Sequence, residues 1–183
     1  MINIPTVTET MRRINSAITN LEHPRDRIML EVYRDHWIAE VRNDMEAIMA
    51  TLPEKQVSYR FDGIGLFIPN YLEFRTTQEA RALYQGAADG DLPMAGPIEE
   101  ERWAFADWGM TFEGVNTVIV RGKSLHIQPR PLDPEQLYFV RWRSISSHPI
   151  DIDRRLMLGE HVFGGAVIDV TAVEREAVDH MLS

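Results

Sequence analysis

The sequence has 183 residues, of which 44% are hydrophobic and 26% are charged, as is usual for one globular domain with a sizeable core. The formal net charge of −9 argues against binding to a nucleic-acid backbone, and the absence of cysteine excludes disulfides, thiolate nucleophiles and cysteine-based zinc sites. The N-terminus lacks the basic and apolar regions of a secretory signal, and no apolar run is long enough to span a membrane. We therefore expect a cytoplasmic protein that binds neither nucleic acid nor membrane.

The first part of the chain predicts two helices. Residues 6–20 form the first, and Pro24 interrupts the helical pattern because proline fits a turn better than a helix interior. A longer amphipathic helix begins near Asp26 and ends at Leu52. One of its stripes recurs at spacings of three and four residues and predicts a core face: Ile38, Val41, Met45, Ile48, Met49 and Leu52.

The rest of the chain predicts mostly strands. A strand at 56–61 precedes an apolar loop or short strand at 62–74, a helix at 76–87 and a loop at 89–97. Strands at 98–107 and 110–121 are predicted to pair across a hairpin turn, and a proline-rich excursion at 122–136 follows. The last elements are strands at 137–150 and 154–165 and a helix at 172–182. Helices segregated from a run of strands predict an α+β fold, in which one curved antiparallel sheet wraps around the long N-terminal helix.

A second stripe on the long helix consists of large or ionisable residues at i, i+4 spacing: Tyr33, Trp37, Glu40 and Asp44. Beside a sheet, such groups can hold an aromatic substrate and supply a general base, because an apolar cavity raises the pKa of a carboxyl group. For Glu40 this role and that of a solvated acid remain open. Asp44 fits a solvated position better.

Blocks within residues 25–165 resemble the SnoaL-like proteins of the NTF2-like superfamily: HWIAEVRNDMEAIMATL, VSY, QEARALYQGAA, FEGVNTVIVRG, YFVRWRSISSHPID and RLMLGEHVFGG. The resemblance implies a cone with an internal cavity at its open end. It makes residues 1–183 one domain, with an N-terminal extension helix at 1–24 and a C-terminal extension at 166–183. The superfamily includes isomerases, dehydratases, cyclases and lyases that need no metal or organic cofactor, and also non-enzymatic binding modules.

The resemblance also suggests roles for two residues. Tyr59 takes the place of the aspartate base of ketosteroid isomerases, and Trp37 takes the place of their oxyanion-hole tyrosine. A phenol and an indole donate hydrogen bonds well but abstract protons from carbon poorly at neutral pH. The alternation of Tyr59 with Val57 and Phe61 predicts a buried ring, either in a pocket or as an ordinary core tyrosine.

Arg141 and Arg143 share one face of the predicted strand 137–150 with Phe139 and Ile145. Two arginines on one face can grip an oxyanion, a phenolate or a carboxylate of a substrate. The alternative is a solvent-facing or interface surface, on which the arginine stems cover apolar side chains.

The six histidines show no zinc-binding spacing, so we predict no metal site. His126 lies beside an apolar strand end, and His161 alternates with Met157 and Phe163. Either is a candidate base near neutral pH or a structural histidine. Glu113, in the middle of a strand, is a further candidate for a buried acid.

The sequence supports three hypotheses. The first is a cofactor-independent lyase, dehydratase or isomerase that transfers protons on a small hydrophobic substrate, aromatic or polycyclic, such as a lignin-derived aromatic dimer, a steroid or a polyketide-like compound. Its predicted catalytic residues are Tyr59, Glu40, Arg143 and His126, and its predicted substrate-binding residues are Tyr33, Trp37, Phe61, Tyr71, Trp108, Glu113 and Arg141. The second is a non-catalytic module that binds a small molecule in the same cone. The third is a dimerisation unit whose outer sheet face includes Arg141 and Trp142, and we expect a homodimer or a higher homo-oligomer.

Overall fold

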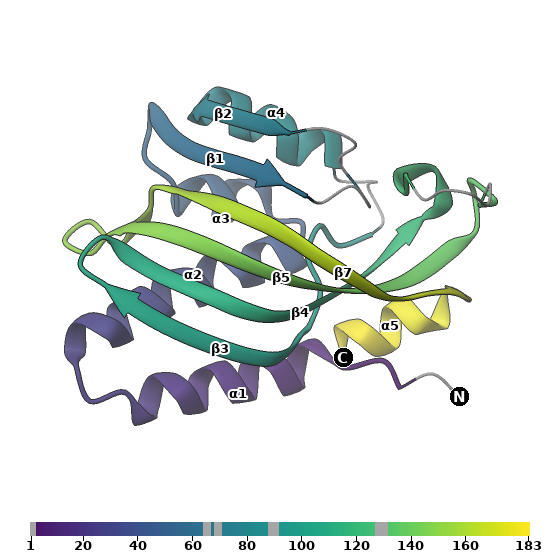
Figure 1. Ribbon diagram of the computed structural model, residues 1–183, viewed down its shortest axis with the longest axis horizontal. Coiled ribbons are helices and arrows are strands. Elements are labelled where there is room, and N and C mark those ends of the chain that lie inside the picture. Colours follow the sequence, from purple (N-terminus) through teal and green to yellow (C-terminus); the bar gives the residue numbers. More distant parts are fainter. Residues whose placement is uncertain (1–2, 64–66, 68–70, 88–91, 127–131) are drawn as a thin grey trace.

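The computed structural model describes residues 3–63, 67, 71–87, 92–126 and 132–183 (Figure 1). Its helices are α1 (Val7–Asn20), α2 (Pro24–Val41), α3 (Met45–Ala50), α4 (Thr77–Ala87) and α5 (Glu176–Leu182), with a 3-10 turn at Gly122–Ser124. Its strands are β1 (Gln56–Asp62), β2 (Leu72–Thr76), β3 (Ile98–Ala106), β4 (Gly109–Arg121), β5 (Leu137–Asp151), β6 (Leu156–Met157) and β7 (Gly159–Val173).

The described strands form a curved sheet in the order β2-β1-β7-β5-β4-β3, with the short β6 paired to the end of β5. Their pairings are antiparallel except that of β1 with β7, which is parallel. In the view of Figure 1, helices α2 and α3 lie behind this sheet, and α1 runs below its edge strand β3. The predicted α+β fold, a curved sheet wrapped around an N-terminal helix, is confirmed.

The predicted continuous helix 26–52 is wrong, because the chain turns sharply between α2 and α3. Asn43 adopts a left-handed φ of 53°, and the backbone N–H groups of Asn43 and Asp44 bond back to the carbonyls of Glu40 and Ala39 at 3.1 and 3.0 Å. The Asp44 side chain then accepts a hydrogen bond of 3.0 Å from the third residue of α3 and so caps that helix. The apolar periodicity continues across the turn, which is why the pattern predicted one helix.

The C-terminal part of the sheet is longer than predicted. The strand expected at 154–165 is β7, which extends to Val173 and pairs with β5 over most of its length. Residues 166–173 are therefore part of the sheet, and the closing helix begins at Glu176 instead of residue 172. In the hairpin, Ala106 pairs with Gly109, as the predicted turn requires.

The loops predicted at 62–74, 89–97 and 122–136 lie partly outside the described residues. Within the first of them the structure places the beginning of β2, and within the third it places the 3-10 turn. Residues 92–97 run past the C-terminal end of α2, where the N–H of Met94 bonds to the carbonyl of Glu40 at 3.4 Å.

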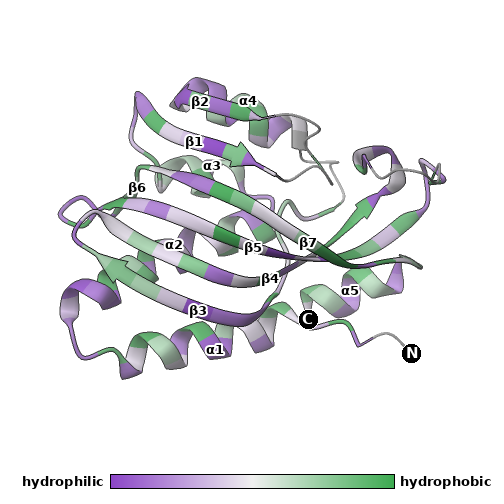
Figure 2. Cartoon of the chain, in the orientation of Figure 1, coloured by the Kyte–Doolittle hydropathy of each residue, from purple (hydrophilic) through white to green (hydrophobic). Residues whose placement is uncertain are grey.

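Helix α1 attaches the N-terminal segment to the main core. One face of the helix carries four buried residues: Val7, Thr10, Ile14 and Ile18. Hydrophilic residues occupy other positions on the helix (Figure 2). The hydroxyl of Thr10 lies 3.3 Å from the backbone oxygen of Ile98 in β3. In the part of the chain that the structure describes, no helix is long and apolar enough to cross a membrane.

Gly159 allows β1 and β7 to pair side by side. It has a φ of 147°, and a Cβ at this position would collide with the carbonyl oxygen of Ser58. In the resulting parallel register Tyr59 lies directly beside Glu160. This pairing brings the two residues to the same level of the sheet, facing α2.

The break between α2 and α3 gives a prediction for stability. Replacing Asp44 by Ala removes the cap of α3 and should lower the free energy of unfolding by about 1 kcal/mol, measured by urea denaturation. Asp153→Ala, at an exposed position, serves as the control and should change it by less than about 0.5 kcal/mol. If D44A were neutral or stabilising, a continuous helix would describe this segment better.

Candidate functional site

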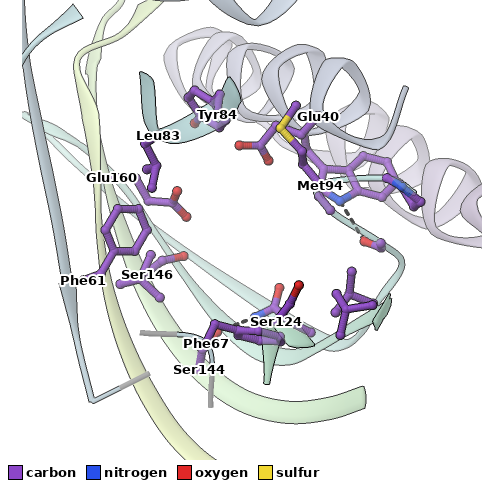
Figure 3. Close-up of a pocket in the computed structure, with 18 of the residues that line it drawn as sticks. Glu40, Phe61, Phe67, Leu83, Tyr84, Met94, Ser124, Ser144, Ser146 and Glu160 are labelled. Carbon is purple, nitrogen blue, oxygen red and sulfur yellow. Dashed lines mark hydrogen bonds between the residues drawn. The ribbon is translucent and has the colours of Figure 1, made fainter. Parts of the chain in front are cut away.

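A cavity of about 630 Å³ lies between α2, α4 and the inner face of the sheet (Figure 3). A volume of this size suits a small organic ligand. Its larger hydrophobic and aromatic lining side chains are Trp37, Phe61, Phe67, Leu72, Leu83, Leu92, Met94, Val118, Val120, Trp142, Met157 and Val162. The polar side chains that line it are Tyr33, His36, Glu40, Tyr84, Asn116, Thr117, Arg121, Ser124, His126, Ser144, Ser146, His148 and Glu160.

Two carboxyl groups face this cavity, Glu40 from α2 and Glu160 from β7 (Figure 3). Oε1 of Glu40 lies 3.4 Å from Nε2 of His36, one helical turn earlier, whereas Glu160 has no basic partner among the described residues. Burial, and to a smaller extent the negative charge of Glu40, raises the pKa of Glu160 from 4.5 to about 8. Glu160 therefore carries a proton at pH 7.

A chain of hydrogen bonds holds His36 beside Glu40. Nδ1 of His36 lies 2.6 Å from Oγ1 of Thr51, and its Nε2 lies 3.0 Å from the hydroxyl oxygen of Tyr84. That oxygen in turn lies 3.1 Å from the hydroxyl oxygen of Tyr59. The Thr51 hydroxyl donates to a backbone carbonyl of α3, so it accepts a hydrogen bond from Nδ1–H of His36. Nε2 of the neutral ring then accepts from Tyr84, and in a protonated ring it donates.

Tyr59 stands behind the cavity wall and does not line the cavity itself. Its ring is fully buried, and its hydroxyl reaches the cavity only through Tyr84. Burial raises the pKa of both tyrosines well above 10. Both phenols therefore remain protonated and act as hydrogen-bond donors, which argues against Tyr59 as the base.

The two aromatic residues predicted on α2 line the cavity in different ways. The indole N–H of Trp37 donates to the carbonyl of Gly96 at 3.0 Å, so Trp37 contributes a flat apolar wall and has no N–H left to bind negative charge. Tyr33 packs edge-on against His148, with ring centroids 4.9 Å apart. Burial, followed by the charges of Glu160 and Glu40, raises the pKa of Tyr33 well above 10.

Besides Tyr59, five of the predicted site residues lie outside the cavity lining: Tyr71, Trp108, Glu113, Arg141 and Arg143. The three charged ones each pair with a residue of opposite charge on β3, at 2.9–3.0 Å. Tyr71 and Trp108 are 52% and 50% exposed. Trp142 and Ser144 lie on the cavity side of β5. Because successive residues of a strand face opposite sides, Arg141 and Arg143 face away from the cavity. These positions do not fit the expectation that the two arginines bind a substrate.

The structure places the remaining candidates as follows. Phe61 and His126 line the cavity, and His126 is exposed, so it lies where the cavity meets solvent. His161 is not among the lining residues, and its Nε2 lies 2.8 Å from Oγ of Ser58. Asp44 is exposed and caps α3.

Sequence reasoning missed several residues of the site: Glu160, His36, Tyr84, Ser146 and His148. The apolar Val162 gave the correct signal, since Glu160 alternates with it on the cavity side of β7.

Two polar side-chain atoms of the lining residues have no hydrogen-bond partner among the described residues: Nε1 of Trp142 and Nδ1 of His148. Burial leaves such atoms unsatisfied unless a ligand or water reaches them. Within the described ranges no three His, Asp or Glu side chains are close enough together to hold a metal ion.

No family model matches the sequence, and no curated protein is significantly similar to it. Its structure resembles a protein from Shewanella putrefaciens that is provisionally assigned as a SnoaL-like polyketide cyclase, with a TM-score of 0.60 and 12% identity over 90% of this chain and 92% of the other. An NTF2-like protein from Burkholderia xenovorans matches with a TM-score of 0.52 and 12% identity, over 76% of this chain and 91% of that one. The CaMKII hub of S. rosetta matches with a TM-score of 0.53 and 9% identity, over 79% and 100%. The chain therefore has the fold of the SnoaL-like and NTF2-like proteins.

Proposed function

We propose that the protein is an enzyme that transfers protons on a small, largely hydrophobic substrate in a lyase, dehydratase or isomerase reaction that needs no cofactor. The observation that carries this proposal is the presence of Glu40 and Glu160 in one hydrophobic cavity, where burial raises the pKa of Glu160 to about 8. Two carboxyl groups whose surroundings separate their protonation states can act as an acid and a base at the same pH.

In this proposal Glu40 is the general base and Glu160 is the general acid. The carboxylate of Glu40 removes a proton from a substrate carbon, and Glu160 gives its proton to a second carbon or to a leaving oxygen. The first outcome shifts a double bond, and the second eliminates water. His36, held by Thr51 and Tyr84, lies 3.4 Å from the Glu40 carboxyl group and orients it.

The walls of the cavity support an aromatic or polycyclic substrate. Trp37 and Phe61 offer flat apolar surfaces, and the aromatic ring of Tyr33 also lines the cavity. His126 and Ser124, both exposed, line the side that meets solvent. A ligand can therefore bind with its apolar part against the aromatic walls and its reacting carbons near the two carboxyl groups.

We also propose that the outer face of the sheet forms a homodimer. Ile145 and Phe163 lie opposite each other on β5 and β7, and they are 47% and 52% exposed. Their neighbours in sequence line the cavity, so these two side chains face outward. The likeness to the CaMKII hub of S. rosetta supports assembly through this fold. Trp142 faces the cavity and is not part of this surface.

The acid–base assignment can be tested with 2-tetralone, an aromatic ketone whose benzylic C–H is acidic. The protein should speed exchange of this hydrogen with D2O, followed by NMR, and Glu40→Gln should lower the rate by about 10²–10⁴-fold because the base is lost. Glu100→Gln, on the outer face of the sheet, is the matched control and should exchange at the wild-type rate. Tight binding of the ketone with no exchange would favour the non-catalytic module.

The raised pKa of Glu160 predicts a pH dependence of stability. Because the folded-state pKa of about 8 exceeds the ordinary 4.5, the folded protein binds one more proton than the unfolded chain between these values. This contribution to the free energy of unfolding is present in full below pH 4.5 and is lost as the pH rises to about 8. Glu160→Gln, which stays neutral, should show a smaller decline between pH 5 and 9 in urea denaturation. An identical decline in both proteins would contradict a protonated Glu160.

The proposed dimer can be tested by light scattering. Wild type should have the mass of two chains, and Phe163→Asp should have the mass of one, because a buried charge without a partner opposes association. Tyr71→Asp, at an equally exposed position on another part of the surface, should remain dimeric. A monomeric wild type would remove this proposal and leave the enzymatic one untouched.

A further inference from the structure

The two carboxyl groups of the cavity have no permanent positive charge beside them in the described structure. Glu40 pairs with the imidazole of His36, at 3.4 Å, and Glu160 pairs with no basic group among the described residues. The one permanently cationic side chain of the described cavity lining is that of Arg121. A carboxyl group in an apolar cavity is costly to ionise without a positive partner, and a positively charged ligand would supply that partner.

The register of the sheet separates Arg121 from Glu160. At the start of β4, Met110 pairs with His148 of β5, and the antiparallel register of β5 with β7 continues so that Glu160 lies beside His148. Arg121 is the last residue of β4 and therefore lies at the other end of that strand. It precedes the 3-10 turn Gly122–Ser124, which adjoins the side of the cavity that meets solvent. The positive side chain of the cavity is thus near solvent, away from the carboxyl groups.

Aromatic rings line the cavity together with these carboxyl groups. Phe61 and Glu160 project into it from the neighbouring strands β1 and β7, and Glu40 and Trp37 project into it from α2 (Figure 3). The ring of Tyr84 lines it from α4. The face of an aromatic ring attracts a cation electrostatically, and cavities lined by such rings are a usual environment for a bound organic ammonium group. The walls and the acids therefore favour the same kind of ligand.

The protonation of Glu160 determines what such a ligand has to displace. Burial, followed by the charge of Glu40, raises the pKa of Glu160 to about 8. A primary alkyl amine has an ordinary pKa of roughly 10, so at pH 7 both groups carry a proton before they meet. An ion pair between them forms when Glu160 releases its proton to the solvent. The ammonium group then takes the place of that proton as the positive partner of the carboxylate.

Other titratable side chains on the elements packed around Glu160 are Tyr33, His36, Glu40, Tyr59, Tyr84 and His148. Burial raises the pKa of all three tyrosines well above 10 and lowers the pKa of His148 to about 3, so at pH 7 these four groups are neutral. Glu40 and His36 are partners of each other. The group whose protonation a cationic ligand changes is therefore Glu160.

We propose that the cavity binds a hydrophobic amine in its protonated form, with the ammonium group paired to Glu160 and the apolar part against the aromatic walls. This inference goes beyond the proposed function, because it requires binding and no catalysis. The ammonium N–H groups donate charge-assisted hydrogen bonds to the Glu160 carboxylate, and the complex holds one proton fewer than the separate partners. In the proposed enzyme such an amine is an inhibitor, since it fills the cavity and removes the proton of the general acid.

The test compares 2-aminotetralin, a bicyclic primary amine, with tetralin, the hydrocarbon of the same ring system. At pH 8 wild type should bind the amine at least about tenfold more tightly, because an ion pair is added to the same apolar contacts. The affinity for the amine should rise about tenfold from pH 6 to pH 7 and level off above about pH 8, since Glu160 has to lose its proton. The affinity for tetralin should not change from pH 6 to pH 7.

Variants identify the carboxyl group. Glu160→Gln stays neutral at every pH, so it should lose both the pH dependence and most of the preference for the amine. Glu100→Gln, on the outer face of the sheet, is the control and should behave like wild type. A pH dependence that survives Glu160→Gln would assign it to another group, such as His36, and would overturn the inference.

A second measurement on wild type guards against loss of folding in Glu160→Gln. Binding heats in buffers of different ionisation enthalpy should show release of about one proton per amine bound at pH 7, and none for tetralin. Equal affinities for the two compounds, or amine binding without proton release, would overturn the inference. If the amine binds with proton release but 2-tetralone does not exchange with D2O, the inference stands and the proposed catalysis fails. If exchange occurs and the amine does not inhibit it, the inference alone fails.

Discussion

Two carboxyl groups that face one hydrophobic cavity cannot both be ionised without strong mutual repulsion, and the chemistry of this site depends on how the fold resolves that conflict. Glu40 has Nε2 of His36 at 3.4 Å. Glu160, which has no basic partner in the described structure, is left with the proton, and its pKa rises to about 8. The difference arises from the neighbours of each group, since the side chains are chemically identical. Helix α2 supplies one set of neighbours and the sheet supplies the other.

The position of Glu40 depends on how α2 ends. The left-handed Asn43 stops the helix within one turn of Glu40, and the side chain of Asn43 donates to the carbonyl of Leu92. The backbone of Met94 bonds to the carbonyl of Glu40 itself. Hydrogen bonds therefore fix residues 92–97 against the C-terminal end of α2. The indole N–H of Trp37 adds a further hydrogen bond, to the carbonyl of Gly96. Residues of this segment form one wall of the cavity.

The same arrangement lowers the stability of the protein at the pH where it is proposed to act. A carboxyl group that must remain protonated, and a buried histidine with an unpartnered nitrogen, both oppose folding. Hydrophobic packing elsewhere offsets this penalty, since Trp37, Tyr33 and Phe112 belong to one core cluster together with residues of α1. Unfavourable polar groups concentrated in one cavity, surrounded by a well-packed core, are typical of a binding or catalytic site.

Local patterns in the sequence determined most of the helices and strands, the hairpin at residues 107–108 and the α+β class, because side-chain periodicity follows from the geometry of each element. They also identified Glu40, Trp37 and Tyr33 as one face of a helix. Only the tertiary structure decided that Glu160 and not His161 faces the cavity, and that Arg141 and Arg143 lie outside it. Alternation shows which residues of a strand share a face, but which face is the inner one depends on the register between strands, here on the close approach of Gly159 to Ser58. His148 became visible for the same reason, since its unpartnered nitrogen is defined by what surrounds it in space and not by its neighbours in the chain.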